Sequence, residues 1–318
     1  MVLWGADKLT EGAAALARRA NIPEIIIGLT IVAAGTSAPE LFVSLVSALK
    51  GTADMAVGNV VGSNIMNTMV IVGCAAMVAP MTISKSTVRK DIPFTVGASA
   101  LMLLLAVDSF LGRIDGIVLL VGFAFFMAYT LMQARKGMRN HDFHGSEAAE
   151  QQMAAPHPDQ ESETPSHDSA SLWRHIGWVV FGLVALVIGS NVFVDHASNL
   201  ALALGISEGV VGLTVVAGGT SLPELATSVV AARKGQSAMA IGNVIGSNVF
   251  NILMILGLTA TISPLAIEGV TTLDMAVMLV SAVLVWLFSF TRYTVERWEG
   301  AVLVLGYLAY LAWMLYNL

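Results

Sequence analysis

The chain has 318 residues, of which 56% are hydrophobic and only 12% are charged. A soluble domain has about a quarter of its residues charged, so this composition excludes an ordinary soluble protein and favours one that lies in a membrane. The net charge of −6 comes largely from residues 140–168, which hold seven carboxylates and neither Lys nor Arg, so it indicates little about partners.

Apolar stretches of about twenty residues follow one another along the whole chain, and a helix of that length crosses a bilayer core of ~30 Å. They predict ten membrane spans. The expected spans are residues 1–19, 23–49, 56–79, 92–107, 114–134, 175–203, 207–232, 240–263, 272–290 and 297–316. Residues 138–172 lack an apolar period and are rich in His, Glu, Gln, Ser and Pro, so we expect a disordered linker there.

The second half of the chain repeats the first half at an offset of 184 residues. The window from Gly28 to Gly73 matches the window from Gly212 to Gly257 at about 27 of 46 positions. Such similarity indicates a duplication. The predicted units are a first five-helix repeat over 1–134, a cytoplasmic linker over 135–172 and a second five-helix repeat over 173–318.

The two repeats are expected to have opposite orientations. Each unit has an odd number of spans, five, so the second unit enters the membrane from the other side. The basic residues support this interpretation. With the N-terminus outside, 13 Lys and Arg residues fall on inner segments and only Lys50 and Arg113 on outer segments. This bias fits the positive-inside rule and places the linker in the cytoplasm. The fold class predicted is therefore an all-α membrane protein with ten transmembrane helices as two inverted repeats.

The first span is unusual, because it lacks a counterpart to roughly the first ten residues of the sixth span. It also carries Asp7, Lys8 and Glu11, and charges cost ~2–3 kcal/mol each near the centre of a membrane helix. We therefore expect additional residues upstream of Met1. For Asp7 and Glu11 we expect contacts with other helices or with the membrane interface.

The second and seventh spans each contain the motif Gly-Thr-Ser-X-Pro-Glu within their most apolar part. The motif runs from Gly35 to Glu40 and from Gly219 to Glu224. A proline inside a helix removes one amide donor and kinks the helix. Backbone freed in this way is tolerated in a membrane only where it lines a cavity or meets protein. The expected carbonyl ligands are Ala33, Thr36, Ala217 and Thr220.

Glu40 and Glu224 follow the two prolines directly, and a carboxylate near the midplane of a membrane indicates a functional site. A buried glutamate could instead be a protonated packing residue. Two such glutamates at matching positions, each beside a helix-breaking proline, favour the functional interpretation.

The third and eighth spans each contain Gly-Asn-Val-X-Gly-Ser-Asn followed by a further asparagine. Ser63 and Asn67 are four residues apart, as are Ser247 and Asn251, so each pair lies on one helix face. The other asparagines of these motifs are expected to make hydrogen bonds between helices. These residues are Asn59, Asn64, Asn243 and Asn248. The glycines of the motif are expected to allow close helix packing.

All of these side chains offer hard oxygen donors, and calcium takes six to eight oxygens. Soft ligands that favour zinc or copper are missing from the motifs. The candidate metal-binding residues are Glu40, Glu224, Thr36, Thr220, Ser37, Ser221, Ser63, Ser247, Asn67, Asn251, Ala33 and Ala217.

The motifs GTSAPE with GNVVGSNIMN and GTSLPE with GNVIGSNVFN resemble the alpha repeats of the sodium/calcium exchanger family, of the prokaryotic type, over nearly the whole chain. The resemblance implies a secondary antiporter that exchanges calcium for sodium by alternating access, with the first and sixth helices sliding. It implies that Glu40 and Glu224 bind both ions. Family members commonly have Asp at one of the positions of Asn67 and Asn251, and here both are Asn, which leaves the sodium stoichiometry open.

A calcium/proton antiporter of the same superfamily is the alternative function. A passive channel is disfavoured by the inverted repeat, and an intramembrane enzyme by the lack of a nucleophile and base pair in the spans. We expect no cofactor, no nucleic acid and no protein partner. The expected partners are calcium ions, sodium ions and the lipid bilayer, with a bacterial inner membrane as the location.

Overall fold

The computed structural model describes residues 2–20, 22–152, 169–206 and 208–316, and this part of the chain is mostly helical. Several long helices are interrupted by π-helical turns, which are labelled η. The first half contains α1 Val2–Arg19, α2 Glu24–Ile27, η1 Gly28–Val32, α3 Ala33–Thr36, α4 Ala38–Leu49, α5 Ala53–Met66, η2 Asn67–Ile71, α6 Val72–Val78, β1 Met81–Thr82, η3 Thr87–Asp91, α7 Ile92–Leu105, β2 Phe110–Leu111 and α8 Arg113–Gln152.

The second half follows the same order of elements, except that η3 has no counterpart. It contains α9 Ser169–Ala203, α10 Glu208–Val211, η4 Gly212–Val216, α11 Ala217–Thr220, α12 Leu222–Arg233, α13 Ser237–Val249, η5 Phe250–Leu256, α14 Gly257–Ile262, β3 Leu265–Ala266, α15 Thr272–Phe290, β4 Thr294–Val295 and α16 Arg297–Tyr316.

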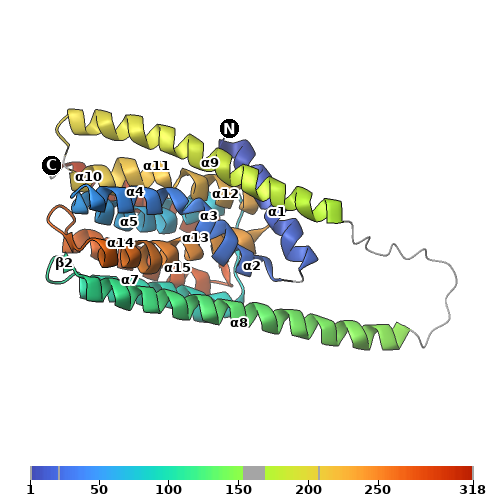
Figure 1. Cartoon of the computed structure of the whole chain (residues 1–318). Helices are drawn as coiled ribbons and strands as arrows, with labels where there is room; N and C mark the ends of the chain where they lie inside the picture. The colour runs from blue at the N-terminus through green and yellow to red at the C-terminus, as the bar shows by residue number, and fades with distance from the viewer. Residues whose placement is uncertain (1, 21, 153–168, 207, 317–318) are drawn as a thin grey trace.

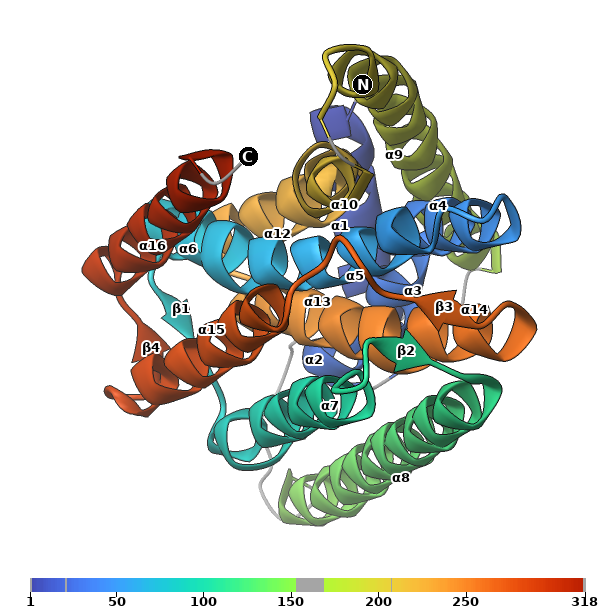
Figure 2. The ribbon, with the colours of Figure 1, turned by 90° about the vertical axis from the view of Figure 1, so that its left-hand side faces the viewer.

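Two continuous helical segments form the centre of the molecule, and they are the ones that carry the Gly-Asn-Val motifs. Residues Ala53–Val78 and Ser237–Ile262 are 78% and 94% buried, whereas Arg113–Ala134 in α8 is only 22% buried. Figure 2 shows α5 and α13 at the centre, with α8 and α9 on opposite sides of the molecule. The outer helices expose large apolar side chains, among them Val121 and Phe125 of α8, as expected for helices that face lipid.

Two short antiparallel strand pairs join the halves, which the sequence analysis did not predict. Met81 of β1 pairs with Val295 of β4, and Leu111 of β2 pairs with Leu265 of β3. The offset of 184 residues that relates Met81 to Leu265 also relates Leu111 to Val295. The two strand pairs are therefore equivalent: exchanging the two halves of the chain turns one pair into the other.

Five helices of the described residues are long and apolar enough to cross a membrane, and seven are if each bent pair counts as one span. The bent pairs are Glu24–Thr36 with Ala38–Leu49, and Gly212–Thr220 with Leu222–Arg233. These seven correspond to seven of the ten expected spans. The other three lie in α1, α7 and α9, where α7 has 14 residues and α9 contributes a shorter apolar stretch, Trp173–Gly189. The protein is thus a helical integral membrane protein.

The linker differs from its prediction at its two ends. The fifth span was expected to end at residue 134, but α8 continues as a helix to Gln152, and α9 begins at Ser169. A helix can extend past the apolar segment, because Ala, Glu, Gln, Lys and Arg are good helix formers and they are frequent between Ala134 and Gln152. The remainder of the predicted linker, 153–168, lies outside the described residues (Figure 1).

Candidate ion-binding site

The two Gly-Thr-Ser-X-Pro-Glu motifs lie where helices bend. The direction changes by 44° between α3 and α4 and by 50° between α11 and α12. Ser37 and Ser221 are the residues at the breaks, and the prolines that follow are in the first turn of α4 and α12. The first helical turn is where a proline is tolerated, because its missing amide proton would have no partner there. The predicted kinks are therefore confirmed.

Glu40 and Glu224 consequently lie in the first turns of α4 and α12, and neither side chain is exposed. A helix N-terminus has exposed amide donors and the positive end of the helix dipole, which favour a negative charge. The bends thus give each buried carboxylate a favourable local field.

Each glutamate is held by the serine of the other half of the chain. The Ser37 hydroxyl donates to Oε1 of Glu224 at 2.9 Å, and the Ser221 hydroxyl donates to Oε1 of Glu40 at 3.3 Å. Ser247 also donates to Oε1 of Glu224, at 3.3 Å. The two motifs, 184 residues apart in the sequence, therefore form one site in space.

The second oxygen of each carboxylate, Oε2 of Glu40 and Oε2 of Glu224, is buried and has no hydrogen-bond donor among the described residues. Burying an unpaired charge costs several kcal/mol or more. Two buried carboxylates with unpaired oxygens are a suitable environment for cations, which would supply the missing charge.

The threonines of the motifs are buried beside the carboxylates and bond to asparagines across the interface. The Thr36 hydroxyl donates to Oδ1 of Asn243 at 3.2 Å, and the Thr220 hydroxyl donates to Oδ1 of Asn59 at 3.1 Å. The hydroxyl oxygens of Ser63 and Thr220 lie 3.5 Å apart. The predicted serine and threonine residues are therefore all brought to the same buried centre.

Asn59 and Asn243 have a further contact that positions the glutamates. The side-chain amide of Asn59 donates to the main-chain carbonyl of Glu40 at 3.2 Å and to the Ser44 hydroxyl at 2.9 Å. The amide of Asn243 donates to the carbonyl of Glu224 at 3.5 Å and to the Ser228 hydroxyl at 3.0 Å. The prediction of hydrogen bonds between helices is confirmed for both asparagines.

Ser44 and Ser228 were missed in the sequence analysis. The available signal was their match at the 184-residue offset, one turn after each glutamate.

The structure corrects the prediction for Asn64. Its side-chain amide donates to the main-chain carbonyl of Val60 at 2.7 Å, within its own helix. The prediction of a bond between helices was wrong there, since a main-chain acceptor one turn earlier is always within reach of a helical side chain.

Asn67 and Asn251 are fully buried, and they have different surroundings. The amide of Asn67 donates to Oδ1 of Asn248 at 3.1 Å, which confirms the prediction for Asn248. Oδ1 of Asn67 and both side-chain polar atoms of Asn251 have no partner within the described part of the chain. A buried amide without partners is costly, so these oxygens are available to a ligand.

The main-chain carbonyls of Ala33 and Ala217, which were expected as ligands, already accept hydrogen bonds within their helices. The carbonyl of Ala33 accepts the main-chain amide of Ser37 at 2.9 Å, and that of Ala217 accepts the amide of Ser221 at 3.0 Å. Both carbonyls therefore keep their helical hydrogen bonds, because each bend begins after the serine. Each carbonyl also has a threonine hydroxyl at 3.4 Å as a second donor, Thr36 for Ala33 and Thr220 for Ala217.

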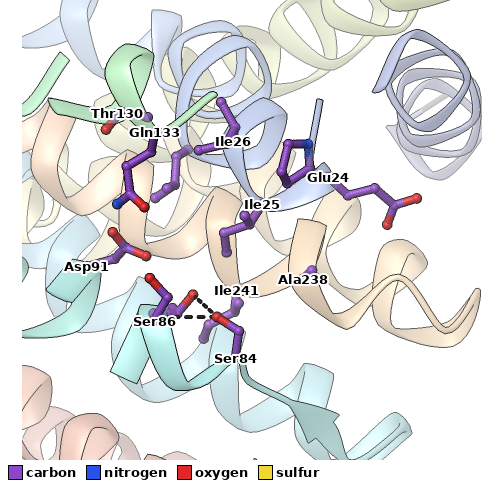
Figure 3. A pocket seen from close by; sticks show the side chains of 13 residues that line it. Glu24, Ile25, Ile26, Ser84, Ser86, Asp91, Thr130, Gln133, Ala238 and Ile241 are labelled. Carbon is purple, nitrogen blue, oxygen red and sulfur yellow. Dashed lines mark hydrogen bonds between the residues drawn. The ribbon is translucent and has the colours of Figure 1, made fainter. Parts of the chain in front are cut away.

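A separate cavity of about 370 Å³ lies between α2, η3, α8 and α13. Figure 3 shows its polar side chains, among them Ser86, Asp91 and Gln133, around a mainly apolar wall. Burial raises the pKa of Asp91, which precedes the fourth span, to about 6. None of the predicted ion ligands lines this cavity, so it is not the candidate ion site.

The bent helices, the paired carboxylates and the surrounding hydroxyl and amide oxygens define a cation transporter of the membrane. Comparison with known proteins supports this class of protein. The family model described as sodium/calcium exchanger protein matches residues 1–132 and 174–316. The chain belongs to the sodium/calcium exchanger family, whose members are membrane antiporters for calcium and sodium ions.

Individual relatives match along nearly their whole length. The chain is 37% identical to the inner membrane protein YrbG of Escherichia coli over 99% of this chain and 94% of the relative. It is 32% identical to the sodium/calcium exchanger MaX1 of Methanosarcina acetivorans, over 98% and 95%. A solved structure of the sodium-calcium exchanger NCX_Mj superimposes with a TM-score of 0.77 at 29% identity, over 98% of this chain and 94% of that one.

Proposed function

We propose that this protein exchanges calcium for sodium across the membrane, with the ions bound between Glu40 and Glu224. The observation that carries the proposal is the reciprocal contact of Ser37 with Glu224 and of Ser221 with Glu40. One calcium ion matches the charge of two carboxylates, and the surrounding oxygens are of the hard type that calcium and sodium prefer. The family membership and the named exchangers among its relatives support both ions.

The remaining ligands in the proposed site are Thr36, Thr220, Ser63, Ser247, Asn67 and Asn251. Their hydroxyl and amide oxygens add donors without adding charge. Ser37 and Ser221 have two roles, since each offers an oxygen and also orients a carboxylate. Ala33 and Ala217 would contribute through their main-chain carbonyl oxygens if the threonine hydroxyls that now donate to them turn toward other acceptors.

The same carboxylates account for exchange instead of leakage. An ion-free site would carry two unpaired negative charges through a low-dielectric interior, and such charges are costly to bury. The conformational change should therefore be favourable only when calcium or sodium neutralises the site. Transport in one direction then requires a bound ion on the return, which is the definition of an antiporter.

The proposed architecture is ten transmembrane helices as two inverted five-helix repeats. The reciprocal strand pairs β1 with β4 and β2 with β3 support such a relation between the halves. The distribution of Lys and Arg supports an outer N-terminus and a cytoplasmic connection between α8 and α9. We place the protein in the bacterial inner membrane, in line with the printed name of its E. coli relative.

Calcium uptake into vesicles tests this function. Purified protein is reconstituted into liposomes loaded with sodium, and uptake of radioactive calcium is measured after dilution into sodium-free or sodium-equal buffer. We expect uptake only with the outward sodium gradient. Uptake driven equally well by an outward proton gradient without sodium would instead favour the calcium/proton antiporter, in which the same two glutamates bind protons.

A further inference from the structure

Lys234, the residue that follows α12, binds three oxygens on one turn of α1. Its ammonium group is 2.6 Å from Oδ1 of Asp7, 3.2 Å from the Asp7 carbonyl and 3.3 Å from the Thr10 hydroxyl. An ammonium group has three hydrogens to donate, so these acceptors match its capacity. None of these residues belongs to the proposed ion site.

The matching position in the first half is Lys50, which follows α4 in the same way. The next residue is a glycine with positive φ in both cases, Gly51 at +83° and Gly235 at +75°. The two lysines therefore leave their helices with the same backbone geometry. No described hydrogen bond or ion pair involves the Lys50 side chain. At the 184-residue offset, the positions that match Asp7 and Thr10 are Asn191 and Val194, so the carboxylate of Asp7 has no counterpart at the matching position.

A cavity of about 370 Å³ lies where the first half would have the equivalent contact. It is between α4 and α9 and is lined by Val43, Lys50, Val194, Ser198 and Val216 among others. Val43 is one turn after Glu40, and the residues that line the cavity include none of the proposed ion ligands. The matching residue on the other side is Thr227, one turn after Glu224, and it is fully buried. Val43 is therefore partly exposed at this cavity, whereas its counterpart Thr227 is buried.

The helices α1 and α9 lie next to each other and are closely packed (Figure 1). A Cβ added at Gly12 would be 2.8 Å from the His175 carbonyl, and one added at Gly182 would be 2.6 Å from the Gly5 carbonyl. Such close approach requires glycine. A contact that holds α1 therefore also restrains α9.

We propose that Lys234, Asp7 and Thr10 form a latch that holds α1 against α12 and keeps the Glu224 side of the ion site closed. The latch positions the helices and does not bind the ions. The inference rests on the proposed alternating access. Because no described contact of Lys50 corresponds to those of Lys234, the latch acts on the Lys234 side and biases the protein toward the conformation with the Glu224 side closed.

The test measures which side of the site water can reach. Single cysteines replace Val43 or Thr227 in a Cys74→Ser background, and a membrane-impermeant maleimide is added to right-side-out or inside-out vesicles. We expect Lys234→Met and Asp7→Asn each to increase labelling of Thr227→Cys about threefold and to lower labelling of Val43→Cys. An effect of this size corresponds to a partly exposed ion pair, as the side chains of Lys234 and Asp7 are 33% and 42% exposed.

The matched control is Lys50→Met, which should leave labelling of Thr227→Cys unchanged; Val43→Cys is not used for this control, because Lys50 lines the same cavity as Val43. The double variant should label no faster than either single variant, and the charge exchange Lys234→Asp with Asp7→Lys should restore the original rates. Unchanged labelling of Thr227→Cys in Lys234→Met, or an equal change in its labelling in Lys50→Met, would overturn the latch. Labelling does not depend on which ion is transported. A protein that shows the expected labelling but no sodium-driven calcium uptake would contradict the proposed function and leave the latch intact.

Discussion

The Ser37 hydroxyl donates to Oε1 of Glu224 at 2.9 Å, across the interface between the two halves of the chain. Ser37 is at the bend between α3 and α4, whereas Glu224 lies in the first turn of α12. A displacement of one half against the other would therefore separate the donor from its carboxylate. In the proposed site, this contact and its counterpart between Ser221 and Glu40 would couple ion binding to the relative position of the halves.

Replacing either glutamate by glutamine should abolish calcium exchange. The attraction between two unit charges 4 Å apart is ~4 kcal/mol at an effective dielectric constant of about 20. Loss of one carboxylate charge in Glu40→Gln or Glu224→Gln should therefore lower calcium uptake by more than about a hundredfold. Glutamine has nearly the same shape, and both variants should remain folded. Uptake is measured in sodium-loaded liposomes, with Glu268→Gln in an exposed loop as the control. Near-normal uptake in either site variant would rule out a two-carboxylate site.

Removing the serine hydroxyls should have a smaller, graded effect. Ser37→Ala removes one oxygen ligand and one donor to Glu224, and a hydrogen bond to a charged group contributes about 1.5–3 kcal/mol. The calcium concentration for half-maximal uptake should rise about tenfold in Ser37→Ala and in Ser221→Ala. Ser99→Ala is the control, because Ser99 is also buried but bonds to the carbonyl of Thr95. If all three variants behaved alike, the serines would have no special role.

Much of the site was predictable from the sequence, because the information is local and occurs twice. The bends follow from Pro39 and Pro223, and the shared face of Ser63 and Asn67 follows from helical spacing. Burial of Glu40 follows from the apolar residues around it. These features depend on the chain within a few residues of each motif.

The partners across the interface could not be predicted from the sequence. Whether Ser37 meets Glu40 or Glu224 depends on how α3 and α12 cross, which no local pattern determines. The same holds for Lys234, whose acid on α1 is 227 residues away in the chain. Asn64 was assigned to the wrong kind of bond because an acceptor in its own helix competes with acceptors in neighbouring helices.

Close packing of the central helices predicts a strong effect at Gly62. A Cβ added there would be 2.7 Å from the Cβ of Ala217, with the Leu213 carbonyl closer still. Gly62→Ala should therefore cost ~1–3 kcal/mol through overpacking and lower the melting temperature of the purified protein in detergent. Gly97→Ala is the matched control, since a Cβ added at Gly97 has no neighbour within 4 Å. Equal melting temperatures for the two variants would contradict the packing argument.

The last prediction concerns pH and the position of Asn251. Protons compete with calcium for carboxylates, so lowering the pH should inhibit uptake, with at most two protons per site because only Glu40 and Glu224 can bind them there. Asn251 is fully buried, and neither polar atom of its side chain has a partner among the described residues. Asn251→Asp would add a third carboxylate beside the ions and a third proton acceptor. The inhibition by acid should then become steeper with falling pH.

Uptake of calcium is measured against pH for the wild type, Asn251→Asp and Asn251→Ala at equal sodium gradient. The alanine variant removes the amide without adding an acid, so its profile should keep the steepness of the wild type even if its maximal uptake is lower. A steeper profile for the aspartate variant alone requires that the side chain at position 251 reach the ions, because a carboxylate outside the site would bind protons without displacing calcium. If all three profiles superimpose, position 251 does not face the ions. The unpaired amide of Asn251 would then have to be explained by helix packing around η5.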